Sequence, residues 1–314
     1  MLRYVIRRSL QAILVIVGVM LATFVLLQLT GDPARAMLPL EADAEAVEQM
    51  RSYLGLDKPL VVQFYYYMAR AARGDFGDSL TYRHIPAREI VFQRLPATVH
   101  LAVSAWLIIV TVFLVLGIIA ALHRGSLIDN FSMVGAMLGQ CIPSFWLGLM
   151  MILLFAVTLQ WLPTSGRSGL DPKYLIMPAL TLAAPATARM TRVVRSSMLE
   201  VLSKDYIRTA RAKGASERVV VLRHALKNAA IPLITLFGLD FGSLLGGSII
   251  TETIFGWPGV GLLSINAITT RDFPIVQTVV FYVAVGFVVI NLLVDLLYAA
   301  LDPRIRLGAQ EVRQ

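Results

Sequence analysis

Few side chains in this sequence are arranged to catalyse a reaction. A Gly-Asp-Ser-Leu run at 77–80 is the pattern of one hydrolase family, but no Asp-x-x-His precedes any histidine, and a serine without a base is not an activated nucleophile. The sequence has neither a His-Glu-x-x-His zinc motif nor a Gly-x-x-x-x-Gly-Lys-Ser/Thr phosphate loop. We therefore predict no catalytic residue, no metal site and no nucleotide held by this chain. The dispersed histidines are His84, His100, His123 and His224.

The most unusual segment is a charged stretch, residues 203–228, between two long apolar runs. Its basic side chains far outnumber its acids, so it cannot lie in hydrocarbon and should face the cytoplasm. Gly214 is predicted to end a first helix in a left-handed conformation, and Ser216 with Glu217 to begin a second. Its charged residues are Lys204, Asp205, Arg208, Arg211, Lys213, Glu217, Arg218, Arg223 and Lys227.

The composition is that of a membrane protein. Hydrophobic residues make up 57% of the chain and charged residues 15%, and the mean hydropathy is +0.71. A helix that crosses a bilayer needs about 20 mostly apolar residues. The sequence therefore predicts an all-α polytopic protein with six transmembrane helices and both termini on one side. The six apolar windows are 9–30, 99–122, 131–159, 175–199, 229–250 and 276–300.

Basic residues beside these windows predict the orientation. Arg3, Arg7 and Arg8 precede the first window, Arg124 follows the second, and the charged stretch follows the fourth. Both termini are therefore predicted to be cytoplasmic. The first window lacks a small-residue cleavage site and is interpreted as a retained signal anchor. These flanking residues, which also suit anionic lipid headgroups, explain the net charge of +8, so we exclude a nucleic-acid partner.

The segment between the first two windows is predicted to be an extracytoplasmic helical region. Apolar spacing over 42–68 indicates helix, with breaks at Gly55 and Pro59, and Pro96 suits the first turn of the next helix. The single cysteine, Cys141, is interpreted as a packing residue of the third window. The predicted parts are 1–30, the N-terminus and first helix; 31–96, the extracytoplasmic region; 97–301, a five-helix permease core containing 203–228; and 302–314, a cytoplasmic tail.

The charged stretch resembles the "EAA" loop of binding-protein-dependent ABC import permeases. Arg208-Thr209-Ala210 stands at the Glu-Ala-Ala positions, Gly214 matches the glycine and Leu226 the leucine, whereas His224 and Lys227 replace an isoleucine and a proline. In that family the loop forms a short coupling helix seated in a groove of a separate ATPase subunit. The alternative is a basic loop that only fixes topology. The resemblance implies ATPase coupling by Asp205, Arg208, Thr209, Ala210, Lys213, Gly214 and Leu226.

Other blocks extend the resemblance over nearly the whole chain, and in order. They look like the B-type subunit of the dipeptide, oligopeptide, glutathione and nickel permeases. The blocks are GDPAR at 31–35, LGLDKP at 54–59, GDFGDSL at 74–80, RLPATVHLA at 94–102, ETIFGWPGVG at 252–261 and RDFPIVQ at 271–277.

The resemblance implies a bacterial inner-membrane importer that moves its cargo unchanged. Its partners would be a second homologous permease in a heterodimer, two ATP-binding subunits that hold ATP and Mg, and an extracytoplasmic binding protein. Short peptides of dipeptide, oligopeptide or glutathione type are the expected cargo, and nickel or a nickel chelate is the alternative. An ion-coupled secondary transporter and a membrane enzyme or sensor are further alternatives, which lack sequence support beyond one well-centred acid.

That acid, Asp240, lies on the fifth window beside a face of small residues. Gly238, Gly242 and Gly246 recur every four residues and permit close helix approach. This face packs within the chain, contacts a second permease or lines the translocation path. A charge at this depth costs at least ~2.5 kcal/mol unless it is paired or wetted. Asp240 therefore either faces a water-filled cavity or pairs with a basic side chain.

Two more sets of residues carry predictions. Arg189, Arg192 and Arg195 form a basic stripe on the fourth window, interpreted as part of a structural network with Asp295 or, alternatively, as a charged inner gate. The broken aromatic segment 253–261 is either an interfacial belt or a loop that contacts the binding protein. The residues predicted for docking or the outer mouth are Glu252, Phe255, Trp257 and Pro258.

Overall fold

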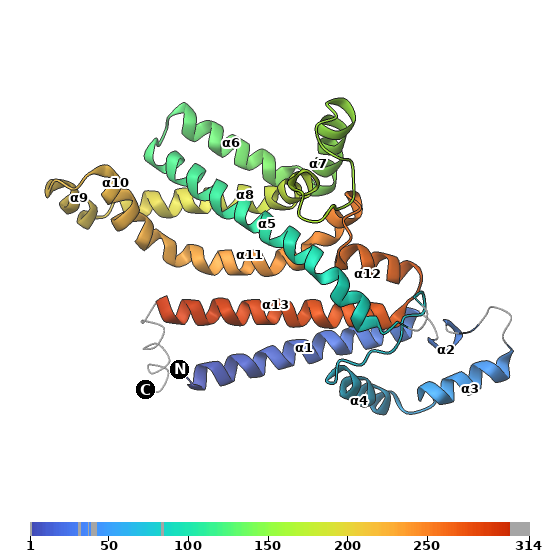
Figure 1. Cartoon of the computed structure of the whole chain (residues 1–314). Helices are drawn as coiled ribbons and strands as arrows, with labels where there is room; N and C mark the ends of the chain where they lie inside the picture. Colours follow the sequence, from blue (N-terminus) through green and yellow to red (C-terminus); the bar gives the residue numbers. More distant parts are fainter. Residues whose placement is uncertain (1, 31–32, 37, 39–42, 83–84, 302–314) are drawn as a thin grey trace. The chain divides into compact units, whose positions relative to one another are not determined.

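The described part of the chain is helical (Figure 1). It contains one isolated bridge, between Asp78 and Pro86, and no strand. The all-α prediction is thus confirmed for these residues. The structure, a computed structural model, describes residues 2–30, 33–36, 38, 43–82 and 85–301.

Fifteen helical segments follow one another along these residues. Two of them, η1 (Ile152–Thr158) and η2 (Val220–Ala225), are π-helical. The α-helices are α1 (Leu2–Thr30), α2 (Pro33–Ala36), α3 (Ala44–Leu54), α4 (Leu60–Ala71), α5 (Ala87–Leu122), α6 (Leu127–Cys141), α7 (Ser144–Met151), α8 (Pro172–Leu202), α9 (Asp205–Ala212), α10 (Glu217–Val219), α11 (Leu226–Ile254), α12 (Val260–Thr269) and α13 (Phe273–Leu301).

The chain divides into two compact units. The N-terminal unit contains the described residues of 2–98 and 258–288, and the core unit contains 99–257 and 289–301. Two of the three boundaries fall inside long helices, α5 and α13, which therefore belong to both units, and the third lies between α11 and α12.

Helix α8 is the centre of the core unit. It packs against α6, α7 and α11, and its C-terminal end continues almost directly into α9 (Figure 1). Asp171 caps its start by accepting a hydrogen bond from Lys173 N at 3.0 Å, with Pro172 in the first turn, where a missing N–H is harmless.

The sequence predicted a single transmembrane helix over the third apolar window, and the structure does not form one straight helix there. It is divided into α6 and a second segment, Ser144–Thr158, which turns by 102° at the break. Pro143 explains the break, because a residue before proline is pushed out of the helical region, and Ile142 is extended at φ −76° and ψ 120°. Cys141, the last residue of α6, is exposed on this chain instead of packed inside it.

Length and composition qualify three described helices to cross a membrane: Ile6–Leu29, Ala87–Leu122 and Phe273–Val294. The bent pair in the third window would supply a fourth. α8 covers the fourth predicted window without meeting the same criterion, and α11 covers the fifth. α8 carries three arginines, which lower its hydropathy. The count of six stays a prediction.

The N-terminal unit contains the predicted helical region after the first window. α3 ends at Gly55, whose φ of +69° is the left-handed conformation that glycine tolerates, and Pro59 precedes α4. α4 packs along α1, where Phe24 meets Phe64 and Tyr67 with ring centroids 5.6 and 5.8 Å apart. The prediction for Pro96 was wrong: α5 already begins at Ala87, so Pro96 lies inside the helix.

A buried carboxylate ties this unit together. Asp272, fully buried between α12 and α13, accepts hydrogen bonds from Ser79 Oγ at 2.5 Å, Thr81 N at 2.9 Å and Ile275 N at 3.3 Å. Segment 79–81 is thereby fixed to the start of α13.

We expect Asp272→Ala to destabilise the protein by several kcal/mol, because it leaves buried donors unsatisfied at about 1–3 kcal/mol each. The midpoint of thermal unfolding of the detergent-solubilised protein measures this. Asp57→Ala removes an exposed carboxylate of the same unit and should leave the midpoint unchanged. Equal midpoints for the two variants would contradict the role given to Asp272.

Candidate functional site: a helix–glycine–helix element and its supports

The charged stretch folds into the predicted helix–glycine–helix element. α9 ends at Ala212, and Gly214 follows with a φ of +79°. Gly214 N donates to Arg211 O at 2.9 Å and Ala215 N to Ala210 O at 3.2 Å, so the last carbonyls of α9 are satisfied by a left-handed cap. A Cβ on Gly214 would meet no atom within 4 Å. The preference for glycine here therefore comes from the backbone conformation and not from lack of space.

α9 is held on one side and free on the other. Ile207 is fully buried, and the helix packs against η2, whose Val220 and Ala225 are also fully buried. The residues predicted to contact an ATPase are mostly on the free side: Asp205, Arg208, Thr209, Lys213 and Gly214 are exposed, and Ala210 and Leu226 are half-buried.

A salt bridge joins the two halves of the element. Arg211 Nε donates to Glu217 Oε1 at 2.7 Å and Arg211 Nη2 to Glu217 Oε2 at 3.2 Å. The neighbouring guanidinium lowers the pKa of Glu217, so the carboxylate remains charged to more acidic pH than usual. The predicted side-chain cap by Ser216 does not form, although Ser216 is the residue at the cap position.

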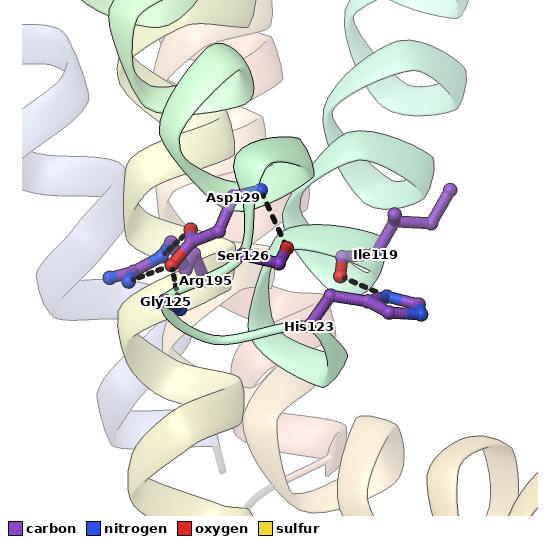
Figure 2. Close-up of polar contacts among 6 residues, drawn as sticks. All are labelled: Ile119, His123, Gly125, Ser126, Asp129 and Arg195. Carbon is purple, nitrogen blue, oxygen red and sulfur yellow. Dashed lines mark hydrogen bonds and ion pairs between the residues drawn. The ribbon is translucent and has the colours of Figure 1, made fainter.

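The turn between α5 and α6 lies at the same end of the core unit. Leu122 and His123 line one cavity with Glu217, Arg218, Val221 and Leu222 of the element. Figure 2 shows how this turn is fixed: Gly125 N donates to Asp129 Oδ2 at 2.9 Å, and Ser126 Oγ accepts from Asp129 N at 3.3 Å. Asp129 is thus oriented from the α6 side.

Arg195 of α8 closes the same cluster. Its Nε donates to Asp129 Oδ1 at 2.5 Å and its Nη2 to Asp129 Oδ2 at 2.7 Å, a bidentate pair that is almost completely buried on the aspartate side (Figure 2). Because α8 leads into α9, this ion pair connects the α5–α6 turn to the helix that immediately precedes α9.

The other arginines of the stripe have partners too. Arg192 donates to the Gln140 side chain of α6, and Arg189 pairs with Asp240 of α11. A structural network therefore exists, but its described partners are Asp129, Gln140 and Asp240. The side chain of Asp295, named in the prediction, lies outside the described residues.

Asp240 matches the pairing interpretation. Its Oδ1 bonds Arg189, whose side chain is half exposed, while the buried Oδ2 has no partner among the described residues. The carboxylate thus keeps one acceptor available beside a charged neighbour.

The three glycines of α11 have different surroundings. A side chain on Gly238 would overlap Val294 of α13, so this glycine permits two helices of the same chain to approach closely. Gly242 is buried. Gly246 is exposed, and a Cβ there would meet nothing within 4 Å.

The aromatic turn after α11 is packed inward. Glu252, Phe255 and Trp257 are buried, whereas Pro258 is half-buried and Gly256 exposed. Gly166 N donates to Phe255 O at 2.9 Å, and the Arg167 guanidinium lies 5.6 Å from the centre of the Trp257 ring. Docking by this segment stays a prediction. Of the four residues predicted for it, Pro258 is the one that is partly accessible on this chain.

The fold is similar to that of a chain of an ABC transporter. A solved chain of the MetNI methionine ABC transporter, in an inward-facing conformation, superposes with a TM-score of 0.55 and 18% identity, over 68% of this chain and 96% of that one. At this identity the likeness concerns the fold alone.

The chain belongs to the family of binding-protein-dependent transport system inner membrane components. Residues 113–307 match that family and residues 1–102 match its N-terminal region. Glutathione transport system permease proteins GsiC of Escherichia coli K12 and Salmonella typhimurium LT2 are 46% and 45% identical over 98% of this chain and 99% of theirs. It is therefore a multi-pass permease of an ABC importer in the bacterial inner membrane, and its family is one of transport components, not enzymes.

Sequence reasoning missed Asp129, Gln140 and Ile207. Asp129 was detectable, because Ser126 and Asp129 form an N-terminal cap pattern and an acid next to an apolar window needs a partner. Gln140 and Ile207 have no local signal, since only the packing of distant helices defines them.

We expect Asp129→Ala to lower the free energy of unfolding by about 1–3 kcal/mol, because the partly buried Arg195 and the backbone N–H of Gly125 would lose their acceptor. Thermal unfolding in detergent measures this. Glu200→Ala breaks the exposed Glu200–Lys204 pair, 3.3 Å apart, and should cost at most about 1 kcal/mol. Similar losses for the two variants would contradict the role given to the Asp129–Arg195 pair.

Proposed function

We propose that this chain is the B-type permease subunit of an importer of short peptides, with glutathione or a similar peptide as its cargo. The observation that carries the proposal is the likeness over nearly the full length to glutathione permeases. At this coverage the similarity includes the N-terminal unit as well as the core. Nickel import by the same machinery is less favoured, because the relatives described above are glutathione permeases.

We propose six spans with both termini in the cytoplasm. Helices over all six windows support this number, with the third span bent at Pro143. The cavity shared by His123 and Glu217 supports a common side for the α5–α6 turn and the charged element, in agreement with the flanking arginines. Hence α9 would project into the cytoplasm.

The proposed mechanism uses α9 as the coupling helix. ATP and Mg would bind two partner ATPases, whose closure would press on the exposed face of α9. Ile207 and the Arg211–Glu217 bridge would pass the displacement to η2, and α8 would carry it to α6 and α11 through its paired arginines. A second, related permease would complete the path, and a binding protein would deliver the peptide.

Affinity purification from native membranes in mild detergent tests the assembly. We expect a second permease and one or two proteins with phosphate loops to copurify. Proteoliposomes of this complex, supplied with the copurifying binding protein, should take up radiolabelled glutathione or a dipeptide only with ATP. Uptake driven by a proton or sodium gradient without ATP would contradict the proposal, and ATP-driven uptake of nickel alone would overturn the peptide assignment.

We expect Gly214→Val to uncouple ATP hydrolysis from uptake. A β-branched residue at positive φ is strained by about 1–2 kcal/mol or more, which would displace α9 without disturbing any contact of Gly214. A strain of this size corresponds to about a tenfold change, so peptide uptake per ATP hydrolysed in proteoliposomes should fall by about tenfold.

Two variants control for strain alone. Gly214→Asn should remain coupled, because asparagine tolerates this conformation. Gly169→Val introduces the same kind of strain at an exposed glycine with φ +53° and no atom within 4 Å, far along the chain from α9. Loss of coupling in Gly169→Val, or normal coupling in Gly214→Val, would remove α9 from the mechanism.

A further inference from the structure

The N-terminal unit contains a cavity of about 610 Å³ that the transport mechanism above does not use. It lies among the end of α1, the α3–α4 turn, α4, segment 75–80 and the start of α13. Pockets for small organic ligands typically measure about 300–1,000 Å³. The space therefore suits a di- or tripeptide and is far larger than a single metal ion needs.

Aromatic rings form much of the wall. Phe24, Tyr66, Tyr67, Phe76 and Phe273 line the cavity, and Phe24 stacks against Tyr67. Phe76 is buried, packed at 5.2 Å between ring centroids against Phe281. Such a wall accepts apolar side chains and the flat faces of peptide bonds.

A hydrogen-bonded glutamine fixes the turn that carries one of the charges. Gln63 Nε2 donates to Leu56 O at 3.0 Å and to Lys58 O at 2.8 Å, and Gln63 Oε1 accepts from Gln28 at 2.9 Å. The backbone at Lys58 is thereby held against α1. The Lys58 ammonium lies 4.8 Å from the centre of the Tyr66 ring, at the wall of the cavity.

Two of the other lining charges already satisfy each other. Arg70 Nε donates to Asp75 Oδ2 at 3.2 Å, and Gly77 N donates to Asp75 Oδ1 at 3.0 Å. The Arg70 guanidinium lowers the pKa of Asp75, so the pair persists into acidic conditions. This pair contributes little net charge to the cavity.

Lys58 and Asp78 are different. Both line the cavity, and neither has an ion-pair partner among the described residues. They come from separate elements, the α3–α4 turn and segment 75–80, so one positive and one negative group face the same aromatic space.

We propose that this cavity is a binding site for a zwitterionic short peptide, with Lys58 receiving the carboxylate and Asp78 the ammonium group. The inference rests on the proposed function and adds to it: the permease itself recognises the two charged ends of its cargo. A singly charged ligand of similar size lacks one of the two ion pairs, and a neutral ligand lacks both.

Direct binding to the permease complex tests the site without the binding protein. The complex is placed in nanodiscs, and calorimetry measures Kd for alanyl-phenylalanine and for glutathione. Lys58→Gln and Asp78→Asn should each weaken binding by about tenfold, the effect of losing one hydrogen bond to a charged group. N-acetyl-alanyl-phenylalaninamide, which lacks both charges, should bind weakly to the wild type and equally to the variants.

Matched variants remove charges that do not line the cavity. Asp57→Asn neutralises the exposed acid next to Lys58, and Lys173→Gln an exposed lysine of the core unit, and both should bind as the wild type does. Peptides that bind Lys58→Gln and Asp78→Asn with wild-type Kd, or do not bind the wild type, would overturn the site. ATP-driven peptide uptake in the same preparations separates this result from failure of the proposed function, which would abolish uptake itself.

Discussion

The fold of the core depends on one electrostatic constraint: a helix with three arginines lies among apolar helices. Charged groups are costly at membrane depth unless they are paired or reach water. α8 meets the constraint with one polar partner for each arginine, Asp240, Gln140 and Asp129. These partners come from α11 and α6. The neighbours of α8 are consequently selected by charge as well as by apolar packing.

The same pairing bears on the mechanism that we propose for α9, in which a small exposed helix would act on a large apolar core. α9 has little buried surface of its own beyond Ile207, and isolated helices of its length are marginal in water. The position of α9 is fixed by α8, which precedes it in the chain, and by η2, against which it packs. Since α8 is tied to α6 through Asp129 and to α11 through Asp240, a displacement at α9 meets a connected set of helices and not a single flexible loop.

Local chemistry made part of this structure predictable. The helix ends at Gly55 and Gly214 and the helix start after Pro59 were predictable, because glycine and proline restrict or permit particular backbone conformations by themselves. The predicted helix–glycine–helix element and the helical region after the first window followed from these residues. The bend at Pro143 had the same kind of signal and was overlooked in a long apolar run. Pro96 misled because proline suits the start of a helix, while the helix here had already begun at Ala87.

Tertiary pairing is what the sequence did not reveal. The basic stripe was predicted to join a network, yet periodicity alone does not decide which acid on another helix lies opposite Arg195. Burial was equally hidden in the aromatic turn, where Trp257 and Phe255 resemble an interfacial belt but pack against the loop at Gly166.

The glycine face of α11 shows why spacing cannot settle such a role. Three equivalent positions on one helix face have different environments: a Cβ on Gly238 would overlap Val294 of α13, whereas a Cβ on Gly246 would meet none of the described residues within 4 Å. The first closes the core of this subunit. Only the C-terminal half of the face is open, so the second permease that we propose would approach α11 at Gly246, where a small residue permits close contact between backbones.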